Sequence, residues 1–267
     1  MAELTVTERQ PGHYLVEVAA GGSTTTHQVE VPSGLAVRLG GPGATDQGLV
    51  EESFRYLLER EPNTSILRSF SLDQIGDYFP GWSEEIARRL AVERQVALER
   101  QVAVERQVDE HLRTLEVPYE VVECDPELAD TAAFCATYGY AAQDAANTIL
   151  VVGKSDPPRY VACVVLATTR LDVNHAVRDR LGTRKASFAD RDLTQVVTGM
   201  AIGGVTAFGL PADLPLWVDR RVTTRPSIVL GGGSRRRKIV GPPTLLTTQP
   251  GVEVVDGLAT DPSELPS

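Results

Sequence analysis

The chain has 267 residues, of which 42% are hydrophobic and 23% charged, so it has material for one large or two modest globular domains. No apolar run approaches the roughly 20 residues that a membrane-spanning helix needs, and the N-terminus lacks the features of a signal peptide, so we expect a cytoplasmic protein without membrane contact. Three cysteines without paired spacing and four scattered histidines argue against a disulfide framework, a metal site or another bound cofactor.

The net charge of −10 is unevenly distributed along the chain. Residues 1–90 carry 7 basic and 13 acidic side chains, and the segment from Thr247 onward carries four acids and no base. Residues 112–246 carry 16 basic and 14 acidic side chains. The acidity therefore lies outside residues 112–246, and the charge of that part does not exclude an RNA partner.

Residues 1–90 are predicted to form a small α+β domain of unknown function. Three short alternating segments, beginning at Leu4, Tyr14 and His27, are separated by Pro11-Gly12 and Gly21-Gly22, as in β-hairpins. Helical patterns follow, first between residues 49 and 58 and then after Ser71 and Ser83. No chemical motif occurs here, which leaves residues 1–90 as a surface for a protein partner.

Residues 91–111 contain the repeat AVERQV, ALERQV, AVERQV. All of these residues favour helix, but a period of six matches neither 3.6 residues per turn nor a heptad, so the apolar positions spread around the helix. We predict a helical linker between two domains. A helix that binds a partner protein is the alternative.

Residues 112–246 alternate between strand and helix patterns, with glycine-rich turns near the end. Apolar runs at 147–152 and 160–166 read as buried strands, and 131–138 and 190–197 as helices. The fold class predicted is mixed α/β with a curved, partly closed β-sheet and surrounding helices. Residues 247–267, rich in Pro, Thr and acids, are predicted to be a flexible tail.

The segment TGMAIGGVTAFGLP, residues 198–211, is the strongest candidate for chemistry. Its glycines allow positive φ and close approach to a ligand, so that backbone N–H groups could serve as donors to an oxyanion or a hydroxyl. A tight connection between two core elements is the alternative.

This segment resembles the glycine-rich signature of the YbaK, or prolyl-tRNA-synthetase-associated, editing domains. The resemblance continues through the helix at 131–138, the strand pair at 148–166, Leu216-Trp-Val-Asp219, and the Gly231–Ser234 turn with its basic continuation. It implies a YbaK-like fold for residues 112–246 and hydrolysis of a wrong amino acid from the acceptor end of charged tRNA. Neither a metal nor a cofactor is implied.

Two departures from the family pattern matter. Asn147 stands where the family carries its key lysine, and asparagine has no charge and a shorter reach. Ala207 stands where the family has proline. Lys154 replaces the family's lysine only if the fold brings it back to Asn147, because seven residues along a strand separate the two by about 23 Å.

The resemblance implies two sets of site residues. Those expected to act on the ester are Asn147, Gly203, Gly204, Thr206 and Gly209. Those expected to bind substrate are Thr131, Tyr138, Thr198, Gly199, Asp219, Arg235, Arg236, Arg237 and Lys238. The four adjacent cations could grip phosphates, or form only a solvated basic turn. Asp219 also fits a structural acid that closes a strand.

Three functions remain open at this stage. The first is a deacylase that edits mischarged tRNA with an Asn-variant site. The second is a module that binds aminoacyl-tRNA or a small ligand without hydrolysis, because the cation is lost. The third is a regulatory adaptor that uses the fold as a scaffold.

Overall fold

The computed structural model describes residues 2–261 and divides into two compact units, residues 1–99 and 100–267. None of its described helices combines the length and the apolar content needed to cross a bilayer. The helix α4 (Trp82–Thr114) contributes residues to both units, and it includes the whole AVERQV-type repeat. The predicted helical conformation of the repeat is therefore confirmed.

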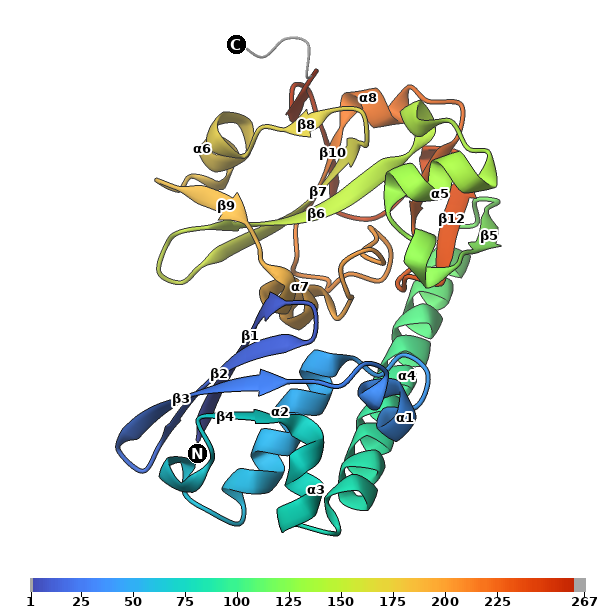
Figure 1. Ribbon diagram of the computed structural model, residues 1–267. Helices are drawn as coiled ribbons and strands as arrows, with labels where there is room; N and C mark the ends of the chain where they lie inside the picture. The colour runs from blue at the N-terminus through green and yellow to red at the C-terminus, as the bar shows by residue number, and fades with distance from the viewer. Residues whose placement is uncertain (1, 262–267) are drawn as a thin grey trace. The chain divides into compact units, whose positions relative to one another are not determined.

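The first unit is a four-stranded sheet with helices (Figure 1). Strands β1 (Glu3–Gln10), β2 (His13–Ala20) and β3 (Ser23–Glu30) form an antiparallel meander, and β4 (Ser69–Ser71) pairs with β3 in parallel. Gly12 and Gly21 adopt positive φ in the two hairpin turns, as the turn signals predicted. The α-helices are α1 (Leu35–Gly40), α2 (Asp46–Leu58), α3 (Ile75–Tyr78) and the first part of α4.

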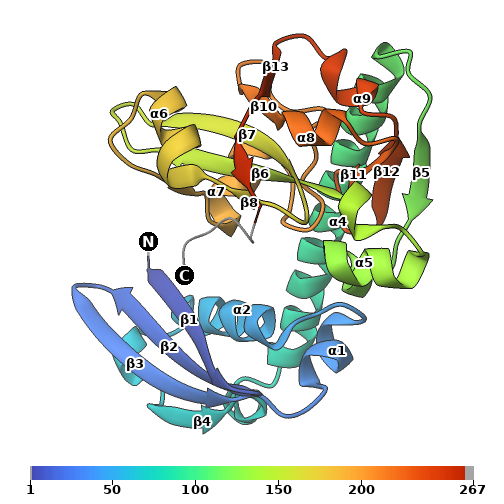
Figure 2. The same ribbon diagram turned by 90° about the horizontal axis from the view of Figure 1, so that it is seen from above.

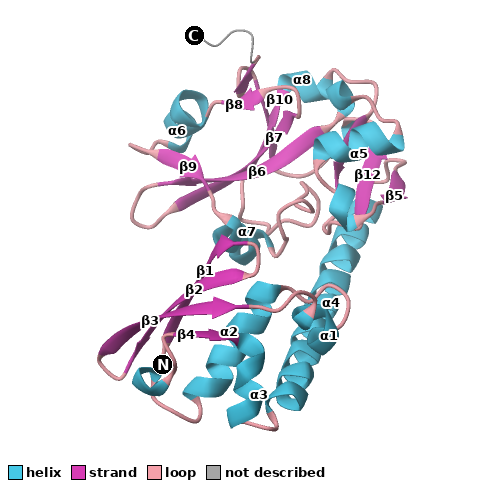
Figure 3. Ribbon diagram, viewed as in Figure 1, coloured by secondary structure: helices cyan, strands magenta, loops and turns pink. Residues whose placement is uncertain are grey.

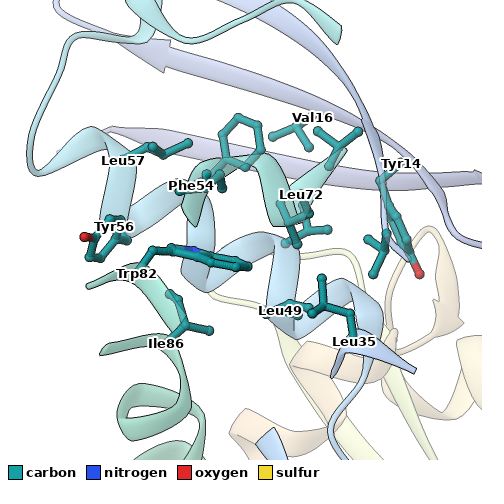
Figure 4. Packing of buried hydrophobic residues seen from close by; sticks show 14 of the residues in the cluster. Tyr14, Val16, Leu35, Leu49, Phe54, Tyr56, Leu57, Leu72, Trp82 and Ile86 are labelled. Carbon is teal, nitrogen blue, oxygen red and sulfur yellow. The ribbon is translucent and has the colours of Figure 1, made fainter. Parts of the chain in front are cut away.

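The core of this unit lies between the sheet and the helices. Figure 4 shows Phe54 of α2 next to Val16 of β2, with Trp82 and Ile86 of α4 on the helical side. All four side chains are almost completely buried. Burial of each stabilises the fold by roughly 1.5–3 kcal/mol, which explains the apolar spacing of α2. The predicted small α+β architecture is confirmed.

The second unit is mixed α/β, as predicted. Its central sheet has the order β13-β10-β7-β6-β9, with β6 (Ala146–Gly153) antiparallel to β7 (Arg159–Leu166) and β10 (Leu216–Asp219) parallel to β7. A second sheet has the order β11-β12-β5, and a third pairs β14 with β8. The remaining strands are β5 (Glu120–Glu123), β8 (Arg170–Leu171), β9 (Ala186–Phe188), β11 (Ile228–Gly231), β12 (Arg237–Gly241), β13 (Val252–Val255) and β14 (Ala259–Thr260).

Besides the end of α4, the α-helices of this unit are α5 (Thr131–Tyr138), α6 (Arg178–Leu181), α7 (Arg191–Thr198), α8 (Arg220–Thr223) and α9 (Thr244–Thr247). Both views place α5 beside β5 and β12 (Figures 1 and 2), where Phe134 and Cys135 pack against Cys124 and Val229. Val108 and Leu112, near the end of α4, are fully buried in the core beneath the central sheet.

Two predictions about this unit need correction. The strands do not form one curved, partly closed sheet. Within residues 2–261 they form separate sheets, drawn in magenta in Figure 3, linked at one place by an isolated bridge between Ala145 and Val229. The predicted flexible tail is also not observed over its described part, because β13 pairs with β10 and β14 with β8. Its last six residues, 262–267, lie outside the described residues.

Candidate active site

A cavity of about 290 Å³ lies within the unit of residues 100–267. Its walls come from the first turn of α5, the first half of β6, the turn at residues 202–203, and strands β11 and β12. Apolar side chains form much of the wall. The polar side chains that line it are Asp130, Thr131, Asn147, Thr148, Thr194 and Lys238. Apolar walls with a few convergent polar groups are typical of a ligand site.

Asn147 lies at the beginning of β6, paired with Val165 of β7, and is half-buried in the cavity wall. The hydroxyl of Thr131, the first residue of α5, donates a hydrogen bond of 2.7 Å to Asn147 Oδ1. Because Oδ1 accepts this bond, the Nδ2 group of the amide is left to donate elsewhere. The pair therefore offers a neutral, oriented donor at the cavity.

Lys238 lies on β12, opposite Gly231 of β11, and only 5% of its surface is exposed. Its Nζ donates hydrogen bonds to the carbonyl oxygens of Ala129, at 2.6 Å, and Gly203, at 3.3 Å. Burial lowers the pKa of the Lys238 ammonium below its ordinary range, and the neighbouring Arg235 cation acts in the same direction. The structure thus brings a buried amine to the same cavity as Asn147.

Of the other three cations predicted to bind phosphates, Arg235 and Arg237 form hydrogen bonds or ion pairs with other parts of the protein. Arg235 donates two hydrogen bonds to the carbonyl oxygen of Pro126. Arg237 is buried and forms an ion pair of 2.9 Å with Asp109. Arg237 and Lys238 differ in surroundings because successive side chains of a strand point to opposite faces. Arg236 is exposed and Arg235 half-buried, whereas Arg237 and Lys238 are buried, so the four residues do not form one exposed basic surface.

The glycine segment borders the cavity through one turn. Gly203 lines the cavity with φ of +91°, and Val205 follows it in the wall. No described residue accepts a hydrogen bond from the backbone amide of either residue. These two amides, rather than those of all four glycines, are therefore the donors that a ligand could use.

Gly204 has a packing role. A Cβ at Gly204 would lie 2.5 Å from the backbone of Ser234. The carbonyl oxygen of Gly204 accepts a hydrogen bond from the Gly233 N–H. A Cβ at Gly231 would lie 2.2 Å from the carbonyl oxygen of Val205. The two glycine-rich segments thus pack backbone to backbone, which only glycine permits.

Other predicted site residues do not line the cavity. Thr206 is fully buried, and its hydroxyl has no partner among the described residues. The carbonyl oxygen of Gly209 accepts a hydrogen bond from Gln107 of α4. Asp219 is buried and accepts hydrogen bonds from the backbone amides of Arg221 and Ala259. These contacts fit the alternative interpretation of Asp219 as a structural acid that closes a strand.

The remaining predicted residues belong to helix ends. Tyr138 accepts a hydrogen bond from the Asp125 amide and stacks on Phe134. The Thr198 hydroxyl donates to the carbonyl oxygen of Thr194 in α7 and accepts from the Met200 amide, and Gly199 ends the helix with φ of +74°. None of the three lines the cavity.

Sequence reasoning missed several cavity residues, among them Thr148, Thr194, Ile202 and Val205, and the position of Lys238 inside the wall. A signal for Lys238 was present, because Arg237-Lys238-Ile239-Val240 continues directly into a predicted strand. The sequence favours a strand at Lys238–Val240, and beginning it one residue earlier, as in β12, places Arg237 and Lys238 on opposite faces. No cluster of three or more His, Cys, Asp or Glu within residues 2–261 is arranged to hold a metal ion.

Comparison with known proteins agrees with this architecture. Residues 125–248 match the family model of the aminoacyl-tRNA editing domain. Among solved structures, the chain is similar to the hypothetical protein APE2540, with a TM-score of 0.52 and 21% identity over 58% of this chain and 99% of that one. It is also similar to a candidate trans-editing enzyme for prolyl tRNA synthetase, with a TM-score of 0.50 and 24% identity over 57% of this chain and 95% of that one.

Residues 125–248 are therefore an aminoacyl-tRNA editing domain of the YbaK type, which confirms the resemblance seen in the sequence. All residues that line the cavity, from Ala129 to Lys238, belong to this domain. Aminoacyl-tRNA is the substrate class of the family.

Proposed function

We propose that this protein hydrolyses mischarged aminoacyl-tRNA at the cavity beside Asn147, as a cytoplasmic deacylase in translation quality control. The observation that carries the proposal is that one cavity of an editing domain joins an oriented amide donor, Asn147, to unpaired backbone amides at Gly203 and Val205. Donors held in fixed positions stabilise the charge that develops on an ester oxygen during hydrolysis.

In this proposal the aminoacyl ester enters with its carbonyl oxygen toward these donors. Asn147, at the position of the family's lysine in the resemblance, donates from Nδ2 to the ester while Thr131 holds Oδ1. A neutral donor stabilises an oxyanion less than a charged one, since charge-assisted hydrogen bonds are roughly twice as strong. Gly204, Thr206 and Gly209 act indirectly here, by keeping the turn in place.

The second candidate function is binding without hydrolysis. The observation that favours it is the neutral side chain of Asn147 in the cavity wall. A module of this kind would hold the aminoacylated end of tRNA in the same pocket, and the hydrogen-bond donors would serve affinity alone.

A deacylation panel tests the proposal. The full chain is incubated with tRNAs carrying different wrong amino acids, and release of each amino acid is followed over time. We expect hydrolysis of at least one substrate, with kcat/KM about five- to tenfold lower in Asn147→Ala, because one hydrogen bond contributes about 1 kcal/mol.

Binding of an amide-linked analogue of the aminoacyl-adenosine end separates the two candidates. If the wild-type chain binds the analogue but hydrolyses no tRNA in the panel, the binding module replaces the enzyme. If the chain neither binds nor hydrolyses, both candidates are wrong.

A further inference from the structure

The buried ammonium of Lys238 has no acidic partner at ion-pair distance among the described residues. Its Nζ contacts two neutral carbonyl oxygens, those of Ala129 and Gly203, and no carboxylate of the described residues lies within 4.0 Å of it. An ammonium group has three N–H donors, so one remains unused. Burying a charge without a counter-charge is costly, and a ligand with a negative or partly negative oxygen would offset that cost.

The surroundings of Lys238 do not neutralise it. The charge of Asp130 favours the protonated form of Lys238, but this carboxylate is exposed at the cavity, lies beyond ion-pair distance of Nζ, and is 3.7 Å from the guanidinium of Arg235. The nearby thiols of Cys124 and Cys135 have pKa values raised by burial, so both are uncharged at neutral pH. The ring of Phe134 lies 5.7 Å from Nζ and adds only the attraction of its face. The charge therefore remains directed at the cavity.

We propose that Lys238 is the catalytic cation of this editing site, acting from β12, while Asn147 acts from β6. This inference rests on the proposed function. Lys238 donates its third N–H to the carbonyl oxygen of the aminoacyl ester and stabilises the oxyanion as water attacks.

The reaction needs no further reactant. The water oxygen forms a bond to the ester carbon, and the bond from that carbon to the ribose oxygen breaks. One water proton ends on the ribose oxygen, and the other is released to solvent as the amino acid leaves as a carboxylate. Lys238 keeps its own protons throughout and remains positively charged.

The other lysines are not alternatives. The chain contains three lysines in all. Lys154 follows the far end of β6, Lys185 precedes β9, and both are exposed and absent from the cavity wall. Lys154 was the substitute cation considered from the sequence, and the structure does not bring it to Asn147. It serves instead as a matched control.

The first experiment compares Lys238→Gln, Lys238→Met and the control Lys154→Met in the full chain. Gln keeps an N–H donor for the carbonyl oxygens but removes the charge, whereas Met removes both. We expect kcat/KM for the best mischarged tRNA to fall about 100-fold in both Lys238 variants, as for the loss of an oxyanion donor, with the control unchanged. Thermal unfolding of each variant shows whether it is folded.

A pH profile tests the charge without any substitution. The charged form of Lys238 is lost as pH rises through its lowered pKa, so enzymatic hydrolysis should decline on the alkaline side, after spontaneous hydrolysis is subtracted. Lys238→Arg should move this decline to higher pH, because arginine stays protonated. Replacing Cys124 and Cys135 by serine should preserve a decline, because the decline does not come from ionisation of these thiols. A merely structural lysine would produce none of these shifts.

A rescue experiment completes the test. Asn147→Lys in the Lys238→Met background returns a cation to the cavity and should raise kcat/KM at least tenfold above that of Lys238→Met alone.

The inference is overturned if folded Lys238→Gln and Lys238→Met keep kcat/KM within threefold of wild type, or if the alkaline decline is absent. If the wild type binds an alanyl-amide adenosine analogue but hydrolyses nothing, the deacylase proposal fails and the catalytic role of Lys238 fails with it. If the wild type neither hydrolyses nor binds, the proposed function fails, and this inference fails with it.

Discussion

Thr131 fixes the orientation of the amide at Asn147 by donating to its Oδ1 atom. In Thr131→Val the shape of the side chain is kept and this hydrogen bond is lost, so the Asn147 amide can rotate. We expect kcat/KM for deacylation to fall about fivefold, which corresponds to about 1 kcal/mol. Thr137→Val, at an exposed position of the same helix, is the matched control. Equal rates in the two variants would contradict an orienting role for Thr131.

Arg236 is the cation of the basic run whose side chain remains exposed and without a partner among the described residues. If this turn contacts tRNA, Arg236→Ala should reduce the slope of log Kd against log salt concentration by about one, because one phosphate contact is lost. Arg184→Ala, another exposed arginine, is the control. An unchanged slope would leave the turn as a solvated basic segment.

Strand β13 covers the edge of the central sheet beside β10. Ending the chain after Thr247 would remove this strand, the buried side chains of Val255 and Leu258, and the Ala259 amide that bonds to Asp219. Each buried side chain contributes roughly 1.5–3 kcal/mol, so we expect the melting temperature to fall by about 10 °C or more.

A chain that ends after Asp261 is the control for this truncation, because it keeps β13 and β14. Its melting temperature, measured by circular dichroism, should equal that of the full chain. If both truncated chains melt together, β13 contributes nothing to stability.

The elements that the sequence could predict are those with strong local signals. The apolar run at 160–166 and the alternating segments at 14–18 became β7 and β2, and α5 has the predicted bounds. Strands β8, β9, β13 and β14 were missed because each has two to four residues and pairs with a partner distant in sequence. Tertiary pairing, not local pattern, decides such short strands.

The cavity was predictable only in part for the same reason. Thr131, Asn147 and Gly203 were proposed from motif positions, and all three line it. Lys238 was assigned to phosphate binding because it belongs to a run of four adjacent cations after a glycine-rich turn. The alternation of a strand separates Lys238 from Arg237, but the burial of Lys238 depends on the pairing of β12 with both β11 and β5, which no local pattern reveals.

At the scale of the whole molecule, α4 belongs to two cores. Ile86 and Leu90 are buried in the first unit, and Val108 and Leu112 in the second. The sequence boundaries at 91 and 111 describe the repeat correctly as a helix. That residues 91 and 111 are also the boundaries of independently folding domains remains a proposal. The stability of fragments of the chain can test it.

Arg237 indicates where the second unit has to begin. Its guanidinium is buried and bonds to the carboxylate of Asp109 and the carbonyl oxygen of Glu105, both on α4. A fragment of residues 100–267 keeps these partners, whereas a fragment of residues 112–267 loses both and also loses Val108. Removing one partner of a buried ion pair costs about 3–5 kcal/mol. We therefore expect 100–267 to unfold cooperatively in urea and to deacylate tRNA like the full chain, and 112–267 to be largely unfolded. Equal midpoints of urea unfolding for the two fragments would show that the end of α4 is a linker, as the repeat alone suggested.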